Sequence, residues 1–166
     1  MTATRIRDRI AITVEGGVAD IRLDRPDKMN ALDHAMFDAL IEAAAFVRDT
    51  GCVRAAVLSG EGRAFCAGLD FASFQAMQAG GDRSLSDLVA RTHGIANRPQ
   101  ASAWCWRELP VPVICALHGV AYGGGLQVAL GADMRFATAD AKLSVMEIKW
   151  GLVPDGAGTQ LLRHLC

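Results

Sequence analysis

Two glycine-rich turns are the part of this sequence whose residue types and spacing could do chemistry. The first, at residues 65–70, follows an apolar stretch at 53–60, and the second, at 123–127, follows another at 113–119. If each turn joins a strand to a helix, it presents unpaired backbone N–H groups at the positive end of a helix dipole. Two such turns facing each other would hold an oxyanion that develops during a reaction. Taken singly, each is also typical of an ordinary tight turn, where glycine is the default residue.

The composition describes an ordinary globular domain. The chain has 166 residues, of which 51% are hydrophobic and 21% charged, with a net charge of −1 at pH 7. This length suits one domain with a substantial core. The small net charge and the lack of a Lys/Arg cluster argue against nucleic-acid binding. The longest uncharged stretch, 109–132, is broken by prolines and glycines, so we expect no membrane partner.

Other reactive motifs are missing from the sequence. The four histidines show neither triad nor metal-ligand spacing, and there is no G-x-S-x-G nucleophile motif. Neither glycine-rich turn matches a dinucleotide-binding or phosphate-binding pattern. The five cysteines, an odd number, and an N-terminus without a signal peptide fit a reduced protein. We therefore expect no metal, no separate cofactor and a cytoplasmic location.

Strands and helices alternate along the chain, as in an α/β fold. Residues 10–15 and 18–23 flank a Gly-Gly turn and predict a hairpin. Asn30 or Asp33 can cap the next helix, whose apolar residues recur at helical spacing. The further predicted elements are a strand from 53, helices at 71–81 and 84–96, strands at 113–118 and 133–137, and a helix at 157–165.

Four segments resemble signatures of the crotonase superfamily, the enoyl-CoA hydratase/isomerase family: residues 25–32, 62–70, 118–125 and 141–154. The resemblance covers nearly the whole chain and implies an α/β spiral of repeated ββα units. It also implies that residues 1–166 form one crotonase-like core domain that binds an acyl-CoA thioester. Members of the family are usually homotrimers or dimers of trimers, and they end in helices that trimerise and help to cover the CoA. The chain stops abruptly at Cys166, so we expect those C-terminal helices to be absent.

The resemblance assigns the oxyanion donors to the backbone N–H groups of Leu69 and Gly124. Such donors must be fixed before charge appears on the thioester oxygen, and one of them is worth about 10²–10³ in rate. Flanking residues in the two loops would contact the substrate. These are Ala67, Gly68, Asp70, Tyr122 and Gly123.

The carboxylates decide which reaction the resemblance implies. Hydratases of the family use two glutamates, and Glu147 matches the second of these positions. The first position is Gln127, whose amide cannot exchange a proton at neutral pH, so water addition is disfavoured. Gln127 could still orient a water or the substrate, or it could be a polar residue on a helix face. Glu147, considered without the motif, could be a surface carboxylate.

Asp155 follows Glu147 by eight residues. Isomerases of the family that shift dienoyl-CoA double bonds look similar, with a glutamate and an aspartate at these two positions. Two carboxyl groups along an extended acyl chain suit the removal of one proton and the return of another. The same isomerases carry an aspartate where this chain has Gln127, so the match is incomplete. Asp155 also follows a proline and precedes a predicted helix, a natural place for an N-cap.

The CoA end of the site is less well defined by the sequence. By resemblance, Lys28 and Met29 should line the adenine and phosphate groups, with Arg25 or Lys28 supplying charge. Each of these side chains is, by itself, also typical of a solvated surface. Family members often carry a basic residue at the position of Ala72, which this chain lacks.

Three functions follow from these observations. The favoured one is isomerisation of an enoyl-CoA through an enolate stabilised by Leu69 and Gly124, with proton transfer by Glu147 and Asp155. The second is hydration of a 2-enoyl-CoA. The third is a truncated chain that binds acyl-CoA or a partner without turnover. In each case CoA is part of the substrate and no further cofactor is needed.

Overall fold

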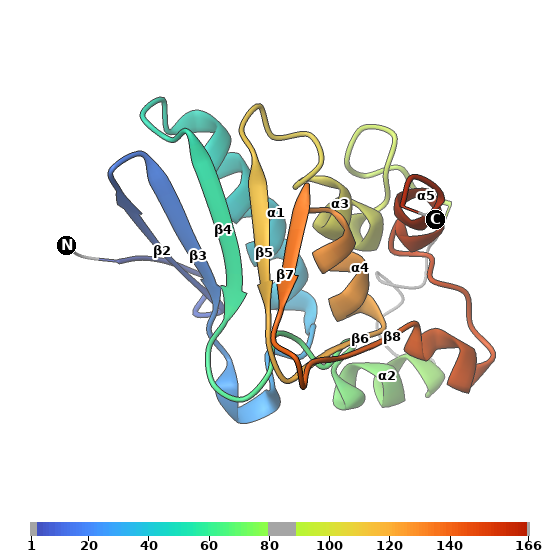
Figure 1. Ribbon diagram of the computed structural model, residues 1–166. Coiled ribbons are helices and arrows are strands. Elements are labelled where there is room, and N and C mark those ends of the chain that lie inside the picture. The colour runs from blue at the N-terminus through green and yellow to red at the C-terminus, as the bar shows by residue number, and fades with distance from the viewer. Residues whose placement is uncertain (1–2, 80–88, 166) are drawn as a thin grey trace.

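The computed structural model describes residues 3–79 and 89–165, and its main element is a six-stranded sheet. The strand order is β1-β2-β3-β4-β5-β7 (Figure 1). Antiparallel pairing joins β1, β2 and β3, and the remaining neighbours are parallel. The strands are β1 (Thr4–Ile6), β2 (Ile10–Glu15), β3 (Val18–Leu23), β4 (Ala55–Gly60), β5 (Val113–Leu117) and β7 (Met134–Ala137). The predicted hairpin, the strand from 53 and the strands at 113–118 and 133–137 are thus confirmed.

A second, smaller sheet lies at one end of the first. It consists of two short parallel strands, β6 (Val120–Tyr122) and β8 (Lys142–Ser144), which the sequence pattern did not predict. Each is only three residues long and directly follows a strand of the large sheet after a turn. The chain therefore repeats a strand-strand-helix unit, seen in β2-β3-α1 and in β5-β6-α4 (Figure 1).

Helices pack along one side of the large sheet and enclose the core. Helix α1 (His34–Asp49) contacts α3 (Arg98–Trp104), which in turn contacts α4 (Gly124–Leu130) (Figure 1). Alternate residues of the strands point into this core, among them Ile12, Ile21 and Leu58, which are almost completely buried. Two further helices lie beyond this layer, α2 (Phe71–Gln78) and α5 (Gly158–Arg163). The alternate apolar residues of the strands and the apolar faces of the helices thus pack together in one core.

Helix α1 forms as its sequence predicts, and Asp33 is the residue that caps it. The Asp33 carboxylate accepts a hydrogen bond from the Met36 N–H at 2.8 Å. The predicted apolar positions, Met36, Leu40, Ala43 and Val47, are all buried. Asn30, the alternative cap, performs a different role that is described below.

The helix predicted at 84–96 is wrong where the structure can test it. Residues 89–96 are not helical, and 80–88, which include the predicted Gly-Gly break, lie outside the described residues. The helix of this region begins later, at Arg98, with a capping box in which Asn97 and Gln100 exchange side-chain hydrogen bonds. Pro99 in the first turn also favours a helix start there. Gly94, just before this box, has φ +65°, a conformation that a continuous α-helix over 84–96 could not contain.

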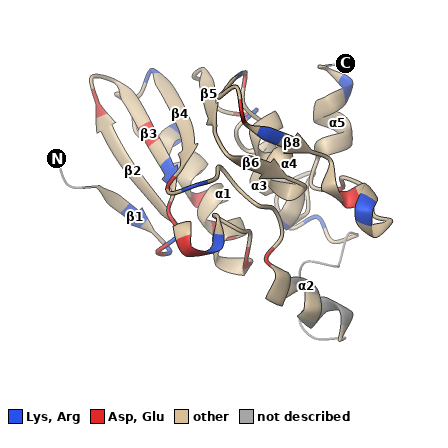
Figure 2. Ribbon diagram, turned by 60° about the horizontal axis from the view of Figure 1, so that its bottom comes forward, with Lys and Arg blue, Asp and Glu red and all other residues tan. Residues whose placement is uncertain are grey.

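Charged side chains lie mainly on the outer surface of the sheet and its turns. Figure 2 shows acidic and basic residues close together on β1 and β3 and at the turns beside them. Arg22 of β3, for example, pairs with both Asp20 and Glu61. None of the helices in the part of the chain that the structure describes has the length and apolar character that crossing a bilayer would require.

Candidate functional site

The two glycine-rich loops lie next to each other because the backbone of the first pairs with β6. Cys66 N–H donates to the Val120 carbonyl, and Tyr122 N–H donates back to the Cys66 carbonyl, both at 3.0 Å. Gly68 follows this pairing with φ +91°, and a Cβ atom there would lie 2.5 Å from the Tyr122 carbonyl oxygen. Only glycine therefore allows the two loops to approach this closely.

In each loop, one backbone N–H group has no acceptor among the residues that the structure describes. Hydrogen bonds from Leu32 N–H to the Gly68 carbonyl and from Asp70 N–H to the Leu32 carbonyl turn the Leu69 N–H away from residue 32. Within the described parts of the chain, neither Leu69 N–H nor Gly124 N–H donates a hydrogen bond. Both residues line the same cavity of about 420 Å³. Two amides fixed in this way can hold an anionic oxygen without reorganising.

Asn30 holds the first glycine-rich loop in place through hydrogen bonds of its side chain. It is completely buried and left-handed, and its side-chain amide donates to the carbonyls of Glu61, Ala64 and Phe65 at 2.9–3.1 Å. The side-chain carbonyl oxygen of Asn30 accepts a hydrogen bond from the Arg25 N–H at 2.8 Å. The local sequence pattern suggested Asn30 only as a helix cap. Its place within the signature at 25–32 was the one signal that pointed to a larger role.

Replacing Asn30 with alanine should lower the free energy of unfolding by about 1–3 kcal/mol, because two buried carbonyls and one partly buried carbonyl lose their donor. Chemical denaturation of Asn30→Ala beside the exposed-site control Gln160→Ala measures this difference. An unfolding free energy for Asn30→Ala that matches the control would contradict this role.

Cys66 lies behind the cavity, and no cysteine of the described residues lines it. Burial raises the pKa of Cys66 to about 12, so its thiol stays neutral at physiological pH. The Cys66 Sγ donates to the Asn30 carbonyl at 3.1 Å. Helix α4 begins directly against it, since a Cβ atom at Gly125 would lie 2.5 Å from the Cys66 carbonyl oxygen. Cys66 is therefore a packing residue that lets α4 approach the first loop.

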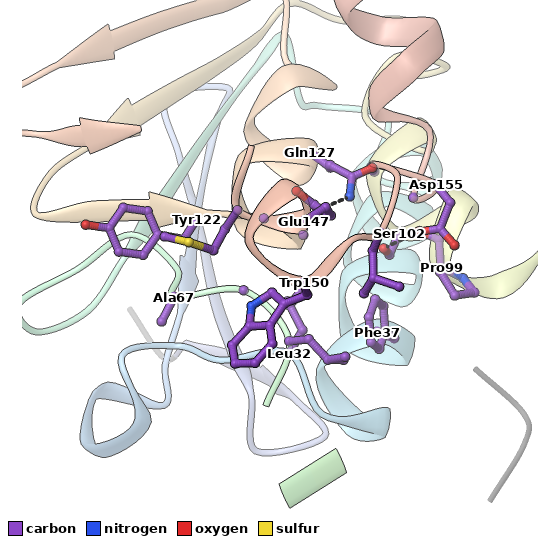
Figure 3. A pocket seen from close by; sticks show the side chains of 18 of the residues that line it. Leu32, Phe37, Ala67, Pro99, Ser102, Tyr122, Gln127, Glu147, Trp150 and Asp155 are labelled. Carbon is purple, nitrogen blue, oxygen red and sulfur yellow. Dashed lines mark hydrogen bonds between the residues drawn. The ribbon is translucent and has the colours of Figure 1, made fainter. Parts of the chain in front are cut away.

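Glu147 and Gln127 meet inside the cavity and bond to each other. Glu147 comes from the 3-10 helix η2 (Met146–Trp150) and Gln127 from α4. The Gln127 Nε2 donates to Glu147 Oε1 at 2.6 Å (Figure 3). Only 9% of Glu147 and 5% of Gln127 are exposed, so neither is a surface side chain. Glu147 Oε2 is buried and accepts no hydrogen bond from any described residue.

Asp155 lines the same cavity at its open side. In Figure 3, Asp155 and Glu147 lie on either side of Gln127. Desolvation of the carboxyl by the cavity wall raises the pKa of Asp155. The alternative role as an N-cap is wrong, because α5 starts at Gly158 with Ala157 at the cap position and no side-chain cap.

The remaining predicted substrate residues separate into two groups. Asp70 and the pair Lys28 and Met29 do not line the cavity, whereas four loop residues do. Lys28 is exposed in the 3-10 helix η1 (Pro26–Lys28), and the Met29 carbonyl accepts from Ala67 N–H at 2.9 Å. The predicted substrate residues that line the cavity are Ala67, Gly68, Tyr122 and Gly123.

Asp70 supports the first loop through its carboxylate. Arg25 Nη1 donates to Asp70 Oδ2 at 2.7 Å, and the Ala72 N–H donates to Oδ1 at 2.9 Å. Burial alone would raise the pKa of Asp70, but the hydrogen bonds from Arg25 and from the backbone at the start of α2 outweigh it and lower the pKa. Asp70 therefore stays ionised and ties the loop to Arg25, which is itself one of the residues considered for CoA phosphates.

The apolar wall of the cavity was not found from the sequence. It comes from segments far apart in the chain, including α1, α3 and η2, so no local pattern could reveal it. Phe71, Trp150, Leu152 and Val153 line the cavity and are also exposed at its mouth. The more enclosed apolar residues are Leu32, Phe37, Pro99, Ala103 and Met146. The cavity thus combines an apolar wall with a few polar groups, as small-molecule sites do.

Proteins of known sequence resemble the chain over nearly its whole length. A family model described as enoyl-CoA hydratase/isomerase matches residues 13–165. The 1,2-epoxyphenylacetyl-CoA isomerase of Escherichia coli K12 is 38% identical, over 90% of this chain and 55% of that protein. A probable enoyl-CoA hydratase of Bacillus subtilis is 34% identical, over 92% of this chain and 55% of that protein. The chain therefore spans about half the length of these relatives.

Solved structures agree with the sequence relatives. The structure of a Thermobifida fusca protein in complex with acetoacetyl-CoA matches with a TM-score of 0.80 at 33% identity, over 96% of this chain and 62% of that one. The α/β crotonase fold expected from the sequence is confirmed. The chain belongs to the enoyl-CoA hydratase/isomerase family.

Proposed function

We propose that the chain is the core of an enzyme that isomerises the double bond of an enoyl-CoA through an enolate. One observation carries this proposal. Two backbone N–H groups, at Leu69 and Gly124, line the same cavity as the buried carboxylate of Glu147, and neither these N–H groups nor Glu147 Oε2 has a hydrogen-bond partner among the described residues. An oxyanion site beside a base is what proton abstraction next to a thioester requires.

In the proposed reaction, Glu147 removes a proton from the carbon next to the thioester. The electron pair of that C–H bond moves toward the thioester oxygen, whose negative charge Leu69 N–H and Gly124 N–H stabilise. Asp155 in its acid form then donates a proton to the more distant carbon, and the double bond moves without gain or loss of atoms. Glu147 loses its proton to solvent and Asp155 regains one, so the net charge of the site is restored.

Gln127 supports isomerisation over hydration. Both polar atoms of its side chain are engaged, one by Glu147 and the other by Gly158 N–H at 2.9 Å. An amide cannot replace the glutamate that hydratases of the family carry at this position. Hydration remains the alternative, because the family includes hydratases and a probable hydratase is 34% identical to this chain.

An acyl-CoA is the substrate class that the site suits best. The matching Thermobifida fusca structure contains acetoacetyl-CoA. The wall of the cavity here is largely apolar, which suits an acyl group. To test the proposal, the protein is incubated with 2-enoyl-, 3-enoyl- and 3,5-dienoyl-CoA, and the masses of the products are measured by mass spectrometry. A rearranged product of unchanged mass supports isomerisation, whereas a product heavier by one water supports hydration.

Asp155→Asn should remove the acid that returns the proton, so we expect kcat for isomerisation to fall about 10²-fold. Since burial raises the pKa of Asp155, its proton-bearing form persists above the usual range for aspartate and is lost as pH rises. Wild-type kcat should therefore decline as pH rises through that pKa, and this dependence should vanish in Asp155→Asn. A pH–rate profile of the variant that still follows the wild-type profile would contradict the role of Asp155.

A further inference from the structure

We infer that Gln127 is a positioning residue that holds Glu147 by one oxygen and, through Gly158, holds the segment that carries Asp155. This inference rests on the proposed function, since it concerns the two carboxyl groups of that reaction. Three elements meet at this one side chain: α4, which carries Gln127, η2 with Glu147, and the start of α5 with Gly158.

The orientation of the Gln127 amide is determined by its neighbours. A backbone N–H can only donate, so Gly158 N–H at 2.9 Å requires the oxygen of the amide to face it. The amide nitrogen must then face Glu147, where it lies 2.6 Å from Oε1. Both bonds are buried, where losing a partner is costly. Swapping the two ends of the amide would break both bonds at once.

The segment after Asp155 packs directly on this amide. A Cβ atom at Gly158 would lie 2.7 Å from Gln127 Oε1, and one at Gly156 would lie 3.2 Å from it. Between these glycines, Ala157 adopts a left-handed conformation with φ +71°. The chain from Asp155 to Gly158 is therefore shaped around the Gln127 side chain, and the position of Asp155 follows from that contact.

The same contact determines which oxygen of Glu147 exchanges the proton. Oε1 is occupied by the Gln127 Nε2, so the substrate must reach Oε2, which is buried and has no hydrogen-bond partner among the described residues. When Oε2 takes up a proton, Oε1 becomes the carbonyl oxygen of the acid and still accepts from Nε2. Because an amide does not titrate, the bond between Gln127 and Glu147 persists through both halves of the reaction.

The first experiment needs no turnover. Amide hydrogen exchange at Gly158 is measured by NMR on glycine-labelled protein for the wild type, Gln127→Met and Gln160→Met. Methionine preserves the size of the side chain but offers no comparable acceptor, so we expect exchange at Gly158 to accelerate about tenfold or more in Gln127→Met. Gln160 is exposed on α5, and its variant should exchange like the wild type. Unchanged protection of Gly158 in Gln127→Met would overturn the inference.

The second experiment separates positioning from a merely structural effect. Gln127→Met should lower kcat about 10- to 100-fold and leave KM close to the wild-type value, because the acid–base groups are misplaced but the acyl-CoA still binds. Glu147→Asp shortens the side chain and already breaks the hydrogen bond to Gln127. Adding Gln127→Met to Glu147→Asp should therefore lower kcat little further. If Gln127→Met lowered kcat by the same factor in the wild type and in Glu147→Asp, the inference would be overturned.

The two experiments also keep this inference apart from the proposed function. If the wild type rearranges no acyl-CoA, the proposed function fails, and exchange at Gly158 alone decides whether Gln127 holds the segment. If the wild type is active but the double variant loses activity additively, the proposed function stands and the positioning role fails.

Discussion

Glu147→Gln should lower kcat for isomerisation by about 10²–10⁴, because an amide cannot take the proton from the carbon next to the thioester. The substitution preserves shape, and the new side-chain carbonyl can still accept from Gln127 Nε2, which lies 2.6 Å from Oε1 in the wild type. We therefore expect KM and the free energy of unfolding to change little. Steady-state kinetics measures kcat and KM, and chemical denaturation measures the free energy of unfolding.

The matched control for this variant is Glu15→Gln. Glu15 is exposed at the end of β2 and does not line the cavity. It should retain wild-type kcat. If Glu147→Gln also kept more than about half of the wild-type kcat, Glu147 could not be the base, since general acid–base help contributes far more than twofold.

Gly68→Ala should damage the oxyanion site and lower the stability of the loops. The new Cβ atom would lie 2.5 Å from the Tyr122 carbonyl oxygen, so the two loops must separate. Separation moves Leu69 N–H away from Gly124 N–H, and losing one oxyanion donor costs about 10²–10³ in kcat. The variant should also be less stable, because the new Cβ atom strains the pairing of the first loop with β6.

Gly16→Ala provides the control for backbone strain alone. Gly16 is left-handed like Gly68, with φ +57°, but a Cβ atom there would meet nothing within 4 Å. Both variants should lose stability from the unfavourable φ, but only Gly68→Ala should lose kcat. Equal kcat values for the two variants would contradict the role of the close approach between the loops.

Local signals predicted most of the elements that position the site. The glycine-rich loops, the Asp33 cap and the apolar spacing of α1 are each encoded within a few neighbouring residues, and all three appear in the structure. The helix predicted at 84–96 shows the limit of apolar spacing. The capping box of Asn97 and Gln100 was present in the sequence and was the better signal for where the helix begins.

Contacts between distant segments could not be predicted in this way. Gln127 and Gly158 are 31 residues apart, and their hydrogen bond exists only because α4 and α5 pack together. Asn30 and the carbonyl of Phe65 are similarly distant in sequence. The roles of Gln127, Asn30 and Asp70 thus depend on the tertiary structure, whereas their positions within recognisable motifs could be read from the sequence.

The most direct test of the proposed chemistry is deuterium exchange in heavy water. The wild type and Glu147→Gln are each incubated with 3-enoyl-CoA, and the acyl group is analysed by mass spectrometry. If Glu147 removes the proton next to the thioester, the wild type incorporates deuterium into the acyl chain, moves the double bond and adds no water, whereas Glu147→Gln does none of these. Equal deuterium incorporation by both proteins, or by neither, would contradict the proposed role of Glu147.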